Sequence, residues 1–178
     1  MVVTGGPGAG KTAILEMARK HFCQHTAILP ESASIVFGGG FWRLNTALAK
    51  MAAQRAIFHV QREMEELISS DGRWALGLCD RGTLDGLAYW PNREEEFWSH
   101  VGSGRASELV RYQAVIHLRT PTEALGYNYQ NELRIETPEE ARLIDERIAK
   151  VWSQHPRYIQ IPSTEDFLIN LGHVLIRK

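Results

Sequence analysis

Short apolar runs alternate with longer amphipathic stretches along most of this chain. The runs have the length and composition of buried β-strands, and glycine, proline or charged residues end each of them. They lie in the first few residues and at Ala27–Leu29, Trp74–Cys79, Ala114–Leu118 and Tyr158–Ile161. We therefore expect five strands.

Between these runs, apolar side chains recur at helical spacing. The stretches with this period are Ala13–Phe22, Asn45–Ile68, Pro138–Trp152 and Asp166–Ile176. Strands that alternate with helices predict an α/β fold, in which a parallel five-stranded sheet has helices on both faces and right-handed crossovers. Ligands bind such sheets at the carboxyl ends of the strands, so the polar residues that follow each strand deserve inspection.

Length and charge narrow the class of protein. With 178 residues, the chain has the size of one domain, and we expect a single domain over residues 1–178. Lys and Arg number 20 against 21 Asp and Glu, which gives a formal net charge of -1. A balanced charge offers no general attraction for a nucleic acid polymer or an anionic membrane, so an anion must be bound at a local site.

The cysteines and the hydropathy favour a cytoplasmic location. The two cysteines, Cys23 and Cys79, cannot form a disulfide framework, and Cys79 lies in an apolar run that is typical of a core position. No apolar run approaches the roughly 18 residues that a membrane span needs. The N-terminal stretch is also too short for the core of a signal peptide.

The first residues carry the strongest motif of the chain. MVVTGGPGAGKT fits the Walker A pattern G-x-x-x-x-G-K-[ST]. The match comprises Gly5, Gly6, Pro7, Gly8, Ala9, Gly10, Lys11 and Thr12. Glycines allow backbone N–H groups to curl around a phosphate, and the helix that follows offers its positive end to the same anion. In this pattern Lys11 reaches the β and γ phosphates and the Thr12 hydroxyl ligates Mg²⁺. The motif predicts a P-loop NTPase fold that binds ATP, with GTP as an open alternative.

Acidic residues follow the second and third strands. Glu31 follows the second strand, at a position where a carboxylate can accept a proton from an attacking hydroxyl. An equal alternative is that Ser32 caps a helix and that Glu31 is solvated beside it. Asp80 follows the third strand, where P-loop proteins place the acid that holds Mg²⁺, and Arg81 can face the transferred phosphoryl group. An ordinary surface pair is the alternative for these two residues. Asp85 either binds substrate or caps the next helix.

Arg81 also bears on the reaction. Hydrolytic motor ATPases commonly place a Glu after the acid to orient water, and an arginine cannot act as such a base. This favours transfer of the phosphoryl group to an acceptor over hydrolysis. The chain also lacks the N-K-x-D motif that reads guanine, which disfavours a switch GTPase of the usual kind.

The later part of the chain contains candidate arginines. The polar and aromatic segment Tyr127–Glu136 stands where a small kinase has a lid over the phosphates. Such a lid would bring Arg134 to the phosphates. Arg142 and Arg147 either join the lid or form ion pairs on the surface of their own helix. After the last strand, Ser163 lies where related folds cradle the base; Ser163, Thr164 and Asp166 are alternatively helix caps.

Several segments together carry a family resemblance. They are GGPGAGKT, PES, CDRG followed by TLDGLAYW, and NELRIETPEEARLIDERI, in that order. With them the chain resembles the small P-loop proteins of the AAA-domain group that are related to the kinase half of NadR, and it is similar to thymidylate and deoxynucleoside kinases. The resemblance implies ATP at Gly5 to Thr12, Mg²⁺ at Asp80, a base at Glu31 and a lid position for Arg134. Gly82 replaces the Ser often found after the Asp-Arg pair of nucleoside kinases, so the resemblance does not carry over the acceptor.

Three functions follow as hypotheses. The first is a Mg²⁺-dependent phosphotransferase that acts on a small hydroxyl-bearing acceptor such as a nucleoside or nucleotide. The second is a regulatory protein that uses ATP or GTP to order a lid and present a surface to a partner. The third is simple NTP hydrolysis. The acceptor and the oligomeric state do not follow from the sequence.

Overall fold

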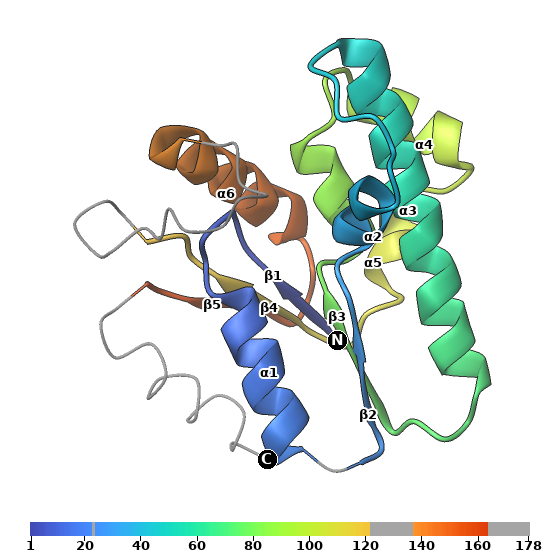
Figure 1. The fold of residues 1–178 in the computed structure, drawn as a ribbon, viewed down its shortest axis with the longest axis vertical. Helices are drawn as coiled ribbons and strands as arrows, with labels where there is room; N and C mark the ends of the chain where they lie inside the picture. Colours follow the sequence, from blue (N-terminus) through green and yellow to red (C-terminus); the bar gives the residue numbers. More distant parts are fainter. Residues whose placement is uncertain (23, 122–136, 164–178) are drawn as a thin grey trace.

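The computed structural model describes residues 1–22, 24–121 and 137–163. Its centre is a parallel sheet of five strands in the order β2-β3-β1-β4-β5 (Figure 1). The strands are β1 (Val2–Thr4), β2 (Thr26–Leu29), β3 (Leu76–Asp80), β4 (Val115–Leu118) and β5 (Tyr158–Ile161). The expected five-stranded parallel sheet is confirmed.

Helices connect these strands and account for most of the other described residues. They are α1 (Lys11–His21), α2 (Ser32–Gly38), α3 (Ala47–Ser70), the 3₁₀ helix η1 (Thr83–Ala88), α4 (Glu94–Val101), α5 (Arg105–Leu109) and α6 (Pro138–Trp152). The bounds of α6 and β5 are those expected from the sequence. The first helix begins two residues earlier than expected, because Lys11 and Thr12 of the motif already form its first turn.

Local sequence explains where the longest helices begin. The side chain of Thr46 accepts a hydrogen bond from the N–H of Ala49 and caps α3. At α6, Thr137 and Glu140 cap each other's backbone N–H groups, and Pro138 takes the first helical position. Within the part of the chain that is described, no helix combines the length and apolarity that crossing a bilayer requires.

Adjacent residues of β1 point to opposite faces of the sheet and so belong to different cores. Val2 packs with Phe58, Phe97 and Trp152 from α3, α4 and α6. Val3 packs in a second cluster with residues of α1, which lies across the other face of the sheet in Figure 1. The two clusters confirm that helices cover both faces of the sheet.

The parallel pairing brings all five carboxyl ends to one edge. Val3 of β1 is in register with Asp80 of β3 and with Ile116 of β4. The loop that follows β1 therefore begins between the ends of its two neighbours, at the edge where such folds bind ligands. The expected lid, the segment Tyr127–Glu136 with Arg134, lies outside the described residues, as does the expected helix Asp166–Ile176.

Candidate functional site: the phosphate loop and its charged surroundings

The loop between β1 and α1 has a backbone that requires glycine. Gly5, Gly8 and Gly10 have φ angles of 144°, 83° and 85°. At Gly5 the neighbouring chain also excludes a side chain, because a Cβ would lie 2.2 Å from the carbonyl oxygen of Leu118 in β4. The loop is therefore shaped both by its own glycines and by the strand beside it.

Lys11 lies inside this loop and is only 8% exposed. Its Nζ donates to the carbonyl oxygens of Gly5 at 3.0 Å and Gly6 at 3.1 Å. Burial, together with the charge of Arg81, lowers the pKa of Lys11 to about 8. An ammonium group held so close to the loop is placed to meet a phosphate. Thr12, the next residue, is exposed on the first turn of α1.

Asp80 is the last residue of β3 and stands next to the start of the loop. Its Oδ1 is buried and has no hydrogen-bond partner. Burial raises the pKa of Asp80, against the opposing effect of Lys11 and Arg81. An unpartnered carboxylate oxygen is costly unless a ligand satisfies it.

This donor set fits Mg²⁺. In nucleotide sites Mg²⁺ takes one or two carboxylates and completes its shell with waters and phosphate oxygens. Asp80, with its unpartnered oxygen, and the Thr12 hydroxyl would supply the protein's share of that shell. The described residues contain no cluster of three or more His, Cys, Asp or Glu able to hold a metal without a nucleotide.

Arg81 connects the loop to Glu31. Its Nε donates to Glu31 Oε1 at 2.6 Å, and its Nη1 donates to the Gly5 carbonyl oxygen at 3.0 Å. The guanidinium carbon also lies 6.0 Å from the ring centre of Tyr89. The backbone of Arg81 has a φ of 71°, a left-handed conformation that other non-glycine residues in the described chain avoid. Hydrogen bonds to Glu31 and Gly5 thus hold this arginine against the phosphate loop.

Glu31 is a paired carboxylate in this structure. Burial acts to raise its pKa, but Arg81 and the hydroxyl of Ser34 outweigh burial and lower the pKa of Glu31 to about 2. Ser32 does not cap α2 beside a solvated Glu31, since its buried hydroxyl donates to Gln61 in α3. That alternative is wrong because α3 packs over α2 and buries Ser32.

Asp85 has a structural position. It accepts hydrogen bonds from the N–H of Gly82 and the indole of Trp152, and also from the hydroxyl of Thr4. The Gly82 contact caps η1, so the capping alternative for Asp85 is confirmed. Because Asp85 is also 3.7 Å from Arg81, it adds negative charge behind that guanidinium.

The remaining candidates are less closely placed. Ser163 follows β5 at the same edge and is half-buried, while Thr164, Asp166 and Arg134 lie outside the described residues. Arg142 is exposed and pairs with Glu139 and Glu146 on its own helix, which is the surface alternative.

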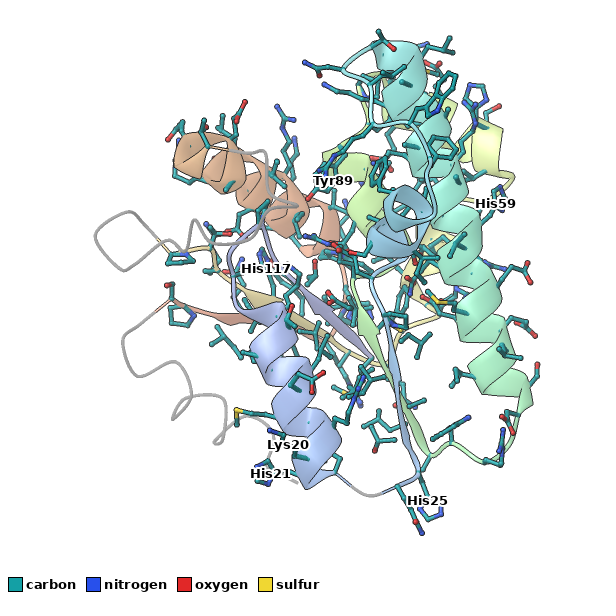
Figure 2. All side chains as sticks on the ribbon, in the orientation of Figure 1. Lys20, His21, His25, His59, Tyr89 and His117 are labelled. Carbon is teal, nitrogen blue, oxygen red and sulfur yellow. The ribbon has the colours of Figure 1, made fainter. Side chains whose placement is uncertain are left out.

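Two residues at this edge escaped the sequence analysis. Arg119 directly follows β4, and its Nε lies 3.0 Å from Oδ2 of Asp145 in α6. Inspection of the residue after the expected strand Ala114–Leu118 would have found Arg119. No sequence signal distinguishes Asp145 from the other charges of α6. Figure 2 labels His117 of β4, two positions before Arg119, and Tyr89, which follows η1.

Comparison with known proteins places the chain in a family. Residues 1–166 match the family model described as AAA domain. The chain belongs to this AAA-domain family. The match covers the phosphate loop, all five strands and every described helix, so an AAA-domain P-loop protein that binds nucleotide agrees with both the motif and the fold.

The family match assigns the AAA domain but no reaction or substrate. No curated protein matches the chain. The expected kinship with the NadR kinase half is therefore finer than what the AAA-domain match shows, and the reaction and its acceptor have to be argued from the site.

Proposed function

We propose that this AAA-domain protein is a Mg²⁺-dependent phosphotransferase that moves the γ-phosphoryl group of ATP to a hydroxyl of a small acceptor such as a nucleoside or nucleotide. The observation that carries the proposal is the position of Arg81. The side chain of Arg81 is 13% exposed, and its guanidinium is hydrogen-bonded to the carbonyl oxygen of Gly5 in the phosphate loop and to Glu31. A buried cation that shares the Gly5 carbonyl oxygen with Lys11 suits the charge that develops on a phosphoryl group during transfer.

The residues of the chain then have separate tasks. The loop amides and Lys11 hold the β and γ phosphates, while Asp80 and Thr12 hold Mg²⁺, which neutralises phosphate charge when bound. The acceptor oxygen bonds to the γ phosphorus as the bond to the bridging oxygen breaks, and ADP leaves. Positioning and charge supply most of the catalysis because this reaction requires little covalent help.

Glu31 takes the acceptor proton only after Arg81 has turned to the phosphoryl group. While the ion pair persists, the pKa of Glu31 stays near 2 and its carboxylate is a weak base. Once Arg81 moves to the phosphate, Glu31 loses its main stabilising charge and its pKa rises. The pair thus couples arrival of the phosphate to activation of the base.

The location belongs to the same proposal. Two cysteines are too few for a disulfide framework, which fits the reducing cytoplasm, where ATP and small acceptors are available.

The proposal is tested by a phosphorus NMR time course with Mg²⁺, ATP and a pool of nucleosides, nucleotides and vitamins. A new phosphomonoester or diphosphate signal is the expected result, and Lys11→Ala should abolish it. Lys20→Ala is the matched control, because Lys20 lies exposed at the far end of the same helix (Figure 2). Orthophosphate alone would instead indicate an NTPase, and binding without turnover would indicate the regulatory function.

A further inference from the structure

A buried carboxylate of α6 contacts the phosphate loop at Gly6, the residue after the one that Arg81 contacts. Asp145 is 1% exposed, and its Oδ1 accepts from the N–H of Gly6 at 2.9 Å and from Nε2 of His117 at 2.8 Å. Its Oδ2 lies 3.0 Å from Nε of Arg119. Although burial acts to raise the pKa of Asp145, these three donors lower it. Asp145 is therefore an ionised carboxylate whose two oxygens are both engaged.

The backbone of Gly6 connects Asp145 to Lys11 through hydrogen bonds. The Gly6 N–H bonds to Asp145, while the Gly6 carbonyl oxygen accepts from Lys11 Nζ at 3.1 Å and from the N–H of Ala9 at 3.3 Å. Gly6 is a variable position of the motif, yet a Cβ there would lie 2.4 Å from Thr120 Oγ1 and 2.9 Å from the carbonyl oxygen of Ala141. Helix α6 thus packs directly on the loop and leaves no room for a side chain at position 6.

A second layer of hydrogen bonds holds Asp145 in place. His117 is fully buried in β4, and its Nδ1 contacts the hydroxyl of Tyr158 in β5. That hydroxyl accepts from Nε2 of Gln160. Since Nε2 of His117 faces a carboxylate, which can only accept, it carries the proton. The carboxylate of Asp145 is consequently oriented by β4 and β5, and not by α6 alone.

We propose that Asp145 is a positioning residue of the phosphate site, which fixes the Gly6 backbone so that its carbonyl oxygen guides the Lys11 ammonium to the incoming phosphates. The proposal rests on the nucleotide binding in the proposed function and is independent of the acceptor. Without the Asp145 contact, the backbone at Gly6 gains the rotational freedom of glycine, and Lys11 loses one of its two guiding oxygens. Affinity then falls for the polyphosphate itself.

The test compares Asp145→Asn with Glu146→Gln by titration calorimetry, well below the unfolding temperature of each protein. Asn keeps the shape and one acceptor oxygen but loses the charge. Glu146 is the next residue of the same helix and is exposed, so its substitution makes the same charge change away from the loop. The ligands are Mg²⁺-ATP and inorganic tripolyphosphate, which has no base or ribose.

We expect Asp145→Asn to lower the affinity for both ligands by the same factor, about ten-fold. A loss of this size is typical when a hydrogen bond to a charged group is removed. Glu146→Gln should bind like the wild type. Unchanged affinity in Asp145→Asn would overturn the proposal, as would a loss confined to ATP, because the effect would then arise at the base. If the wild type bound neither ligand, both the proposed nucleotide binding and the positioning role of Asp145 would be overturned.

A measurement on the wild type covers the case in which Asp145→Asn does not fold. The Gly6 amide should exchange slowly with solvent, as followed by NMR, both in the free protein and with tripolyphosphate bound. Fast exchange in either state would show that Asp145 does not hold this amide, and would overturn the proposal.

Discussion

The two charged sides of the site are built in different ways. On one side, the cradle around Lys11 consists of backbone from one short stretch, Gly5 to Thr12. On the other side, Glu31 and Arg81 are 50 positions apart, and they meet through their side chains just after the ends of β2 and β3. Backbone cradles depend on local conformation, which a motif encodes, whereas a side-chain pair depends on how whole elements pack. The difference explains why the sequence specifies the phosphate loop sharply and the pairing of Glu31 with Arg81 only loosely.

The largest expected effect lies on the backbone side. Lys11→Ala should weaken Mg²⁺-ATP binding about 100-fold, because it removes the buried ammonium that the motif places against the β and γ phosphates. Calorimetric titration measures this, with Lys20→Ala as the control. Equal affinities in the two variants would mean that the loop binds no triphosphate.

Asp80 lies between the two sides, and we propose that it binds Mg²⁺. Asp80→Asn should lower Mg²⁺-dependent turnover about 100-fold, because an amide is a poor ligand for Mg²⁺. The same change should leave stability equal or higher by about 1 kcal/mol, since burial disfavours the charged carboxylate in the folded state. Turnover by phosphorus NMR and urea unfolding measure the two effects. Full activity would assign Asp80 a structural role.

Substitution of Glu31 tests how much its ion pair with Arg81 stabilises the fold. The folded-state pKa of Glu31 lies near 2, below its ordinary value of 4.5, so the pair's contribution to stability is complete above pH 4.5 and is lost as the pH falls towards 2. Glu31→Gln should therefore lower the free energy of unfolding by about 2 kcal/mol at pH 7, a value that allows for partial exposure of the side chain.

Urea unfolding at pH 7, 4 and 2.5 follows this difference between the wild type and Glu31→Gln. It should shrink steadily as the pH falls. A difference that stays constant with pH would show that packing, and not the charge of Glu31, stabilises this side.

The smallest effect is expected at Arg142. Its ion pairs with Glu139 and Glu146 are exposed on α6, and such pairs contribute little. Arg142→Gln should leave the unfolding midpoint and the ATP affinity as in the wild type. A fall in affinity would instead place Arg142 at the phosphates and extend the site to this face of α6.

The burial of Cys79 shows what composition and pattern can predict. An apolar run indicated a core position, and Cys79 is 4% exposed, with a pKa that burial raises to about 12. The strands and the bounds of α6 could be predicted from the sequence in the same way, because hydrophobic period and capping residues are local signals. Asp85 was ambiguous, since an acid shortly after a strand serves either as a cap or as a ligand until its partners are known.

The sequence by itself determined the α/β fold, the phosphate loop and the residue types at the strand ends, because each depends on short-range pattern or on the allowed conformations of glycine. Only the tertiary structure decided that Arg81 is held between Glu31 and Gly5. It also decided that Gly6 must be glycine and that Asp145 is the buried partner of the loop. These features come from elements far apart in the chain that pack against one another, and no local pattern records which side chains such packing brings into contact.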